Sequence, residues 1–173
     1  MIDYGLGGKV ALVTGAGGGI GRAAALVFAR SGASVMVSDV NEDGCRETVS
    51  LIEAAGGKAA YQVCDVSKAD QVKALVAATV EKLGGLDCAF NNAGINRVTD
   101  NQYDDEIWSR DIGVNLTGVM MCMREEAEVM IQRGGGAIVN TASINGLVGN
   151  GQQPAYTAAK HGVVGLARLP RAS

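Results

Sequence analysis

The chain has 173 residues, 47% of them apolar, which suits one domain with a buried core. Its net charge of −3 and its lack of basic clusters argue against nucleic acid and anionic membranes as partners. Nothing resembles a signal peptide, no apolar stretch reaches the length of about 18 residues that spans a membrane, and the four cysteines lack zinc or C-x-x-C spacing. We therefore expect a cytoplasmic protein with reduced thiols.

The first predicted element is an apolar strand over residues 9–14, followed by a glycine cluster and an alanine-rich helix over 19–31. A glycine motif between a strand and a helix indicates dinucleotide binding. Gly15, Gly19 and Gly21 follow the pattern G-x-x-x-G-x-G, and glycine lets the backbone turn tightly and approach a pyrophosphate at a helix N-terminus. A glycine cluster alone is often only a flexible turn, so its position between these two elements carries the interpretation.

The second predicted strand covers residues 33–38 and ends at Asp39. An acidic side chain at this point would accept hydrogen bonds from the ribose hydroxyls of adenosine and repel a 2′-phosphate. The alternative is a helix N-cap or turn aspartate ahead of residues 41–43. No Arg or Lys lies among residues 16–18, where a phosphate-binding cation could be placed. The sequence therefore favours NAD over NADP.

Further strands are predicted over residues 59–64, 86–90 and 136–141, with helices over 42–55, 67–83 and 103–133 and a last helix that begins near Tyr156. This alternation is typical of a doubly wound, parallel α/β sheet. We expect the long helix to break around Asp111–Gly113. Asn115 is a poor residue for a helix interior, so it marks either a functional position or a local bend without chemistry.

Tyr156 and Lys160 are four residues apart on the last predicted helix, which places them on one face about one turn apart. A free tyrosine is a poor base at neutral pH, and a cation beside it favours the phenolate form. Ser143, 13 residues before Tyr156, could hydrogen-bond the oxygen whose proton moves. The same spacing occurs on many solvated helices, so the pair gains its meaning from the other motifs. The single histidine, His161, cannot build a His-rich metal site, and we interpret it as structural.

Taken in order, these motifs resemble those of the short-chain dehydrogenase/reductase (SDR) family, over about residues 7–168. The matching positions are Thr14–Gly21, Asp65, Asn91–Gly94, Asn115, Ser143 and Tyr156-x-x-x-Lys160. The resemblance implies one Rossmann-type dinucleotide-binding domain over residues 7–173, with strand order 3-2-1-4-5. It also implies an NAD-dependent oxidoreductase that interconverts a secondary alcohol and a ketone.

The resemblance further implies a role for each position. Tyr156 would be the general acid/base, and Lys160 would bond the nicotinamide ribose. Ser143 would orient the substrate oxygen, and Asn115 would complete a proton relay through water. The residues expected at the cofactor, besides the tyrosine and lysine, are Gly15, Gly19, Ile20, Gly21, Asp39, Asp65, Val66, Asn92, Ala93 and Gly94.

The end of the chain departs from the family pattern. Family members usually complete the last helix, which is predicted here to end near Leu169, and add two strands and a segment that closes over the substrate. The fifth strand would then form an open edge of the sheet. Two hypotheses remain: an active oxidoreductase, and a catalytically incompetent fragment that retains dinucleotide or partner binding.

Residues 144–148 are expected to form one wall of the substrate pocket, with Asn96 and Arg97 opposite. Because this wall is mostly apolar, the sequence favours a hydrophobic or cyclic secondary alcohol over a phosphorylated sugar. Apolar residues also recur at helical spacing in the last two long helices, at Val119, Met120, Met123, Met130, Val163, Leu166 and Leu169. By the resemblance, these helices would pair with a second subunit in a homodimer or homotetramer.

Overall fold

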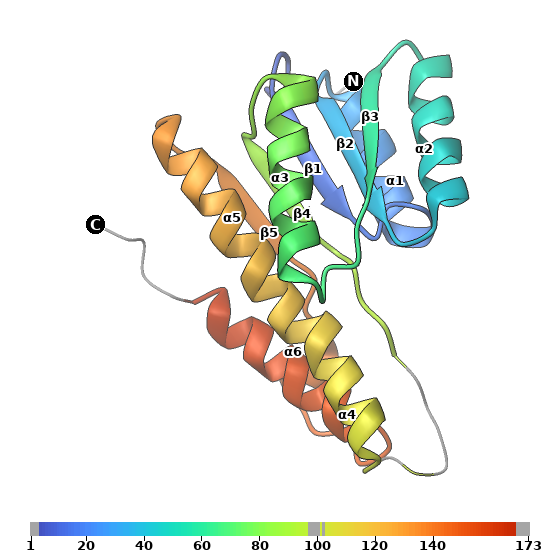
Figure 1. The fold of residues 1–173 in the computed structure, drawn as a ribbon, viewed down its shortest axis with the longest axis vertical. Helices are drawn as coiled ribbons and strands as arrows, with labels where there is room; N and C mark the ends of the chain where they lie inside the picture. The colour runs from blue at the N-terminus through green and yellow to red at the C-terminus, as the bar shows by residue number, and fades with distance from the viewer. Residues whose placement is uncertain (1–3, 97–100, 102, 169–173) are drawn as a thin grey trace.

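The computed structural model describes residues 4–96, 101 and 103–168, and within them a parallel sheet has the strand order β3-β2-β1-β4-β5 (Figure 1). Its strands are β1 (Val10–Thr14), β2 (Ser34–Asp39), β3 (Lys58–Val63), β4 (Cys88–Asn91) and β5 (Ala137–Asn140). The helices are α1 (Gly19–Arg30), α2 (Glu42–Ala54), α3 (Ala69–Leu83), α4 (Asp105–Ile112), α5 (Val119–Gln132) and α6 (Pro154–Leu166). The predicted doubly wound α/β fold and its strand order are confirmed.

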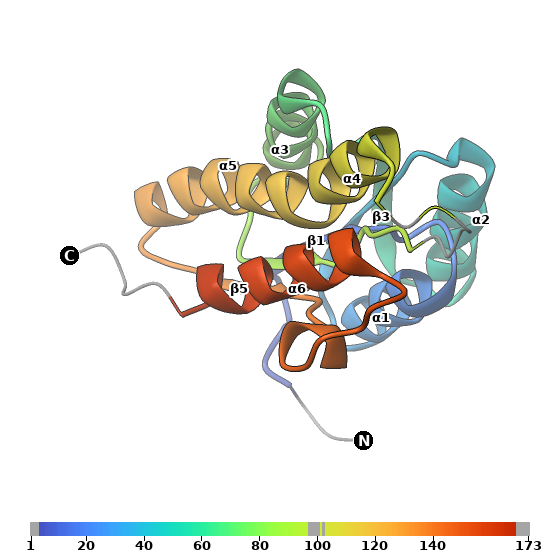
Figure 2. The same ribbon diagram turned by 90° about the horizontal axis from the view of Figure 1, so that it is seen from below.

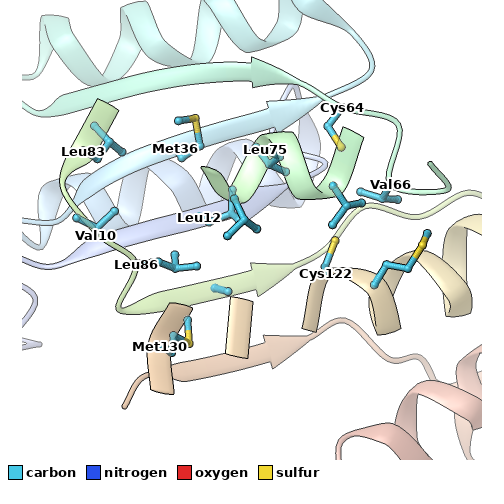
Figure 3. Packing of buried hydrophobic residues seen from close by; sticks show 14 residues of the cluster. Val10, Leu12, Met36, Cys64, Val66, Leu75, Leu83, Leu86, Cys122 and Met130 are labelled. Atoms are coloured by element: carbon cyan, nitrogen blue, oxygen red, sulfur yellow. The ribbon is translucent and has the colours of Figure 1, made fainter. Parts of the chain in front are cut away.

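The two faces of the sheet bury separate apolar clusters. Leu12 and Met36 point from the sheet toward Leu75 of α3 and Cys122 of α5 (Figure 3). Val13, next to Leu12 on β1, belongs to the cluster on the opposite face, which packs under α1 and α2. Successive strand residues therefore serve opposite faces, and both are apolar because helices cover the central strands on both sides.

The segment after β4 differs from the expected broken helix. The helix continues through Gly113, whose φ of −56° and ψ of −48° are helical, and residues Gly113–Gly118 form a π-helical turn, η1, between α4 and α5. The α-helix thus ends at Ile112, within the expected break around Asp111–Gly113, but the break is a change from α-helical to π-helical turns and not an interruption of the helix. Asn115 lies inside this turn. Turns of this kind insert an extra residue into a helix and often occur at functional positions.

The last helix, α6, begins at Pro154, where the missing N–H costs no hydrogen bond, and lies against α4 and η1 (Figure 2). It ends at Leu166, so the predicted end near Leu169, a residue outside the described part, was too late. Strand β5 forms one edge of the described sheet, and its Val139 is 59% exposed. No helix in residues 4–96 and 103–168 is long and apolar enough to cross a membrane.

Candidate active site

The glycine turn between β1 and α1 is built by close backbone contacts. Gly15 has a φ of +65°, and a Cβ there would lie 2.8 Å from Cα of Ala93. A Cβ on Gly21 would overlap the carbonyl oxygen of Gly15. Helix α1 begins at Gly19 without a side-chain cap on its first N–H groups. These contacts explain glycine at positions 15 and 21. A Cβ on Gly18 or Gly19 would meet nothing within 4 Å, so the backbone there stays open to a ligand phosphate.

Asp39 ends β2 and holds this turn in place. Its Oδ2 accepts a hydrogen bond from the Gly17 N–H at 3.0 Å, and its Oδ1 accepts one from the Asn41 N–H at 3.0 Å. The N-cap of α2 is Asn41, whose side chain accepts from the Gly44 N–H, so the alternative of Asp39 as the N-cap is wrong. Asp39 does act as a turn aspartate, and it also lines the cleft described below.

Arg22 brings a cation to the glycine turn that the sequence analysis missed. Its guanidinium donates to the carbonyl oxygen of Gly17 at 2.6 Å and forms an ion pair with Glu47, also at 2.6 Å. Its Nε donates to Oγ1 of Thr48 at 2.9 Å. Residues 16–18 hold no cation, but the side chain of Arg22, on the first turn of α1, reaches back to Gly17. The position of Arg22, directly after Gly21, could have indicated from the sequence that a cation lies at the glycine turn.

A cleft of about 650 Å³ opens at the carboxyl ends of β1 to β4. Of the predicted cofactor residues, it is lined by Gly15, Asp39, Asp65, Val66, Ala93 and Gly94. Asp65, after β3, uses its Oδ1 to accept hydrogen bonds from the N–H and the hydroxyl of Ser67. Ile20 is exposed and lies instead in an apolar groove along α1, outside the lining of the cleft.

The loop after β4 joins the glycine turn to the other half of the site. Oγ1 of Thr14 accepts hydrogen bonds from the N–H groups of Asn92 and Ala93, both at 3.1 Å. The amide of Asn92 donates to the carbonyl oxygens of Thr14 and Gly15. At the end of the loop, a Cβ on Gly94 would lie 3.8 Å from Nζ of Lys160. The predicted cofactor loop and the predicted catalytic lysine are therefore neighbours.

Lys160 is buried beside Tyr156 on α6. Its Nζ donates a hydrogen bond to the carbonyl oxygen of Thr141 at 2.7 Å and lies 5.5 Å from the centroid of the Tyr156 ring. Burial lowers the pKa of Lys160. An ammonium group has three donors, and the Thr141 carbonyl takes one of them, so the others remain for neighbouring groups.

Ser143 lies in the loop after β5, and its Oγ accepts a hydrogen bond from the Asn145 N–H at 3.2 Å. It is the N-cap of a short 3-10 turn, η2 (Ile144–Gly146), which packs on α6. A Cβ on Gly146 would lie 2.8 Å from the carbonyl oxygen of Lys160, so this turn rests directly on the helix that carries the tyrosine and lysine. The loop that bears Ser143 therefore lies beside the Lys160 segment.

Asn115 is fully buried, and both ends of its amide bind one residue. Its Nδ2 donates to the carbonyl oxygen of Ile95 at 2.8 Å, and its Oδ1 accepts from the Ile95 N–H at 3.0 Å. The π-helical turn thus anchors the loop that ends the cofactor motif.

The expected substrate wall divides into exposed and buried residues. Ile144, Leu147 and Val148 are 73%, 69% and 53% exposed. Asn145, in contrast, is buried, and its Nδ2 donates to Oε1 of Gln153 at 2.8 Å. The wall is therefore apolar, with a polar residue that ties the loop to the start of α6. Asn96 is exposed, and Arg97, expected opposite, lies outside the described residues.

The Cys45 and Cys64 thiols and the His161 ring show no sign of a catalytic role in this structure. Burial raises the pKa of the Cys45 and Cys64 thiols to about 11 and about 12, so both stay protonated near neutral pH. The ring of His161 lies 3.0 Å from the carbonyl oxygen of Thr157, one turn earlier on α6. In residues 4–96 and 103–168, no three His, Cys, Asp or Glu side chains group to hold a metal ion.

The doubly wound sheet, the glycine turn and the Tyr156–Lys160 pair are the features of a dinucleotide-binding α/β protein. The family model described as short chain dehydrogenase matches residues 9–172. The chain therefore belongs to the short-chain dehydrogenase/reductase family, and the resemblance stated from the sequence is confirmed.

Relatives with assigned names include cyclohexanol dehydrogenase of an Acinetobacter species, 46% identical over 92% of this chain and 64% of that protein. A 2,5-dichloro-2,5-cyclohexadiene-1,4-diol dehydrogenase of Sphingobium indicum is 45% identical over 96% of this chain and 67% of that protein. The crystal structure of an SDR from Burkholderia phymatum in complex with NAD matches with a TM-score of 0.89 at 38% identity, over 96% of this chain and 59% of that one. The chain thus spans about two thirds of these curated relatives' length.

Proposed function

We propose that this chain carries the NAD-binding and proton-transfer part of an oxidoreductase that interconverts a secondary alcohol and a ketone. The observation that carries the proposal is the position of Lys160. It is buried, bound to the Thr141 carbonyl at 2.7 Å, placed beside the Tyr156 ring and close to Gly94. A cation is thus held between a tyrosine and the cleft, where it can act on both.

The cleft fits a dinucleotide. A Cβ on Gly18 or Gly19 would meet nothing within 4 Å, so the chain leaves the backbone at the first turn of α1 uncovered, where a pyrophosphate could approach. Asp65 and Val66 line the same cleft and would contact the adenine ring. Asn92, Ala93 and Gly94 would lie along the middle of the cofactor. Gly19 and Ile20, at the start of α1, would offer backbone N–H groups to the phosphates.

Asp39 supports NAD as the cofactor. It lines the cleft and carries a negative charge that would repel a 2′-phosphate, whereas ribose hydroxyls can donate hydrogen bonds to it. Arg22, which donates to the Gly17 carbonyl, is paired with Glu47, so its charge is partly neutralised. Both arrangements disfavour NADP.

Bound NAD supplies the acceptor for a hydride from the alcohol carbon. The chain's own residues handle the proton. Tyr156 takes the proton of the substrate hydroxyl, with Nζ of Lys160 held beside its ring at 5.5 Å from the centroid. The hydroxyl of Ser143 hydrogen-bonds the same substrate oxygen. Asn115 positions the loop at Ile95 through its two side-chain hydrogen bonds.

We further propose a hydrophobic or cyclic secondary alcohol as substrate. Ile144, Leu147 and Val148 present apolar surface on the loop that follows Ser143, with few hydrogen-bonding groups for a sugar. The names of two relatives, a cyclohexanol dehydrogenase and a cyclohexadienediol dehydrogenase, support the same class. The four free cysteines suit a reducing compartment, and we propose the cytoplasm.

A second candidate is a module that binds a dinucleotide without turnover. It is favoured by the high exposure of Ile144 and Leu147, which leaves one side of the substrate wall uncovered. The test measures NAD affinity together with the turnover of a panel of cyclic alcohols, open-chain alcohols and polyols. NAD binding with turnover of cyclic alcohols supports the first proposal, and NAD binding without turnover supports the second. A preference for polyols would contradict the proposed substrate class.

A further inference from the structure

Glu126 is a buried acid that neither the sequence motifs nor the proposed chemistry uses. It lies on α5 with no exposed surface, on the same face as Cys122 and Met130, each four residues away. Its Oε2 accepts a hydrogen bond from Nδ2 of Asn91 at 2.9 Å. Within the described residues its Oε1 has no hydrogen-bond partner. A carboxyl group buried in an apolar cluster lowers stability unless a hydrogen bond compensates for the lost water contacts.

The contact of Glu126 is part of a bridge that joins α5 to the ends of two strands. Asn91 is the last residue of β4, and Asn140 is the last residue of β5, directly opposite in the register. Nδ2 of Asn91 donates both to Glu126 and, at 3.0 Å, to Oδ1 of Asn140. Both N–H bonds of one amide are thus used to hold the helix and the neighbouring strand.

The residues that follow this bridge on each strand belong to the site. Asn92, after β4, holds the glycine turn through the carbonyl oxygens of Thr14 and Gly15. Thr141, after β5, accepts the hydrogen bond of Lys160. Oγ1 of Thr141 also donates to Oδ1 of Asn92 at 3.3 Å. The spacing between the carboxyl ends of β4 and β5 therefore sets how the lysine sits relative to the cofactor loop.

We propose that Glu126 is a positioning residue that holds the carboxyl ends of β4 and β5 together through Asn91 and Asn140. It acts on Lys160 and on the cofactor loop through these two strands and does not touch the substrate. The part of the proposal that concerns cofactor affinity rests on the proposed NAD binding. The part that concerns the strands does not.

The strand part is tested by hydrogen exchange of two amides in the chain without ligand. The Thr141 N–H, bound to the Asn91 carbonyl, reports the carboxyl ends of β4 and β5, and the Ala137 N–H, bound to the Asp87 carbonyl, reports their amino ends. Glu126→Ala should accelerate exchange at Thr141 about tenfold more than at Ala137. Met130→Ala is the matched control, since Met130 lies one turn later in the same apolar cluster, near the amino end of β5. It should accelerate Ala137 at least as much as Thr141.

Glu126→Gln provides the rescue, because a glutamine keeps an oxygen that accepts from Asn91. Its Thr141 exchange should stay within about threefold of wild type. If Glu126→Ala does not fold, Asn140→Ala removes the β5 end of the bridge, and the same comparison of Thr141 with Ala137 decides. If Glu126→Ala accelerates exchange at Thr141 and at Ala137 equally, as the Met130→Ala control is allowed to do, the proposal is overturned.

The cofactor part is tested by titration with NAD. Glu126→Ala should weaken NAD binding about fivefold or more, whereas Glu126→Gln and Met130→Ala should stay within about twofold of wild type. Unchanged NAD affinity in Glu126→Ala would overturn the link from the strands to the site. If wild type binds no NAD, the proposed function fails, and the exchange data still decide whether Glu126 holds the strands.

Discussion

Nζ of Lys160 donates a 2.7 Å hydrogen bond to the backbone carbonyl of Thr141, which joins the last helix to the residue directly after β5. The lysine is therefore held by the sheet itself and not only by its own helix. A carbonyl at the carboxyl end of a strand is a fixed acceptor, and it keeps the ammonium beside the Tyr156 ring. The predictions about chemistry follow from this contact.

Tyr156→Phe should reduce turnover by at least about a hundredfold, because the group that takes the proton is removed. NAD affinity should stay within about twofold, since the ring remains. Lys160→Ala should weaken both turnover and NAD affinity, because the lysine serves the tyrosine and the cofactor and its loss leaves the Thr141 carbonyl without its donor. Steady-state kinetics and NAD titration check both. His161→Ala, an exposed neighbour, is the control, and retained activity in Tyr156→Phe would end the proton-transfer argument.

Substitutions at Asp39 should change the cofactor preference. Asp39→Asn removes the charge but keeps an oxygen that can accept from the Gly17 N–H, so the preference for NAD over NADP should shrink about tenfold. Asp39→Ala also removes the acceptor and should lower NAD affinity as well. Dissociation constants for both cofactors provide the measurement. A wild-type preference for NADP would show that the role given to Asp39 is wrong.

Substitution by alanine should affect stability differently at two glycines of the same turn, Gly18 and Gly21. A Cβ on Gly21 would overlap the Gly15 carbonyl, so Gly21→Ala should lower the free energy of unfolding by about 1–3 kcal/mol and weaken NAD binding. Gly18 has extended backbone angles, and a Cβ there meets nothing within 4 Å, so Gly18→Ala should fold as wild type does. Urea unfolding and NAD titration compare the pair. Equal effects of the two substitutions would contradict the close approach at Gly21.

Glu126 should make stability depend on pH. Burial raises the pKa of Glu126 from 4.5 to about 7, opposed by the hydrogen bond from Asn91. The folded protein thus keeps this proton to higher pH than the unfolded chain does. The resulting stabilisation is fully present below about pH 4.5 and is lost as the pH rises through about 7, a change of about 3 kcal/mol.

Glu126→Gln isolates this effect, because glutamine does not titrate in this range. The free energy of unfolding of wild type, minus that of the variant, should fall between about pH 5 and about pH 8 and then level off. The titratable group that interacts with Glu126 from its own helix is the Cys122 thiol, whose pKa burial also raises, so it stays neutral over this range. A difference that does not vary with pH would contradict the raised pKa.

Self-association is expected through the face of α4, α5 and α6. Val119, Met130 and Val163 are buried within the chain, so they do not contribute to such a face, whereas Met120 and Trp108 are partly exposed. Met120→Lys should reduce the average mass measured by light scattering, and Leu51→Lys on α2 should not. A stable, monodisperse wild-type monomer at micromolar concentration would count decisively against self-association.

The sequence by itself determined the fold class, the strand order implied by the family resemblance, and the local patterns at Gly15, Asp39 and Tyr156–Lys160. The local patterns could be predicted because each depends on residues close together in the chain. A strand must lead into the glycine turn, and a spacing of four places two side chains on one helix face. The helix end near Leu169 was predicted too late, since α6 ends at Leu166. The break around Asp111–Gly113 is a change from α-helical to π-helical turns, which no local residue preference indicates.

The tertiary structure alone decided which distant groups meet. Arg22 reaches Gly17, Asn115 binds Ile95, and Lys160 binds the Thr141 carbonyl. The sequence around Glu126 gives no sign of its role. Its position on α5 and the register of Asn91 with Asn140 show that it belongs to the bridge between α5 and the ends of β4 and β5. Such contacts depend on strand register and on how helices cross the sheet, and these follow from the packing of the whole chain rather than from the spacing of residues along it.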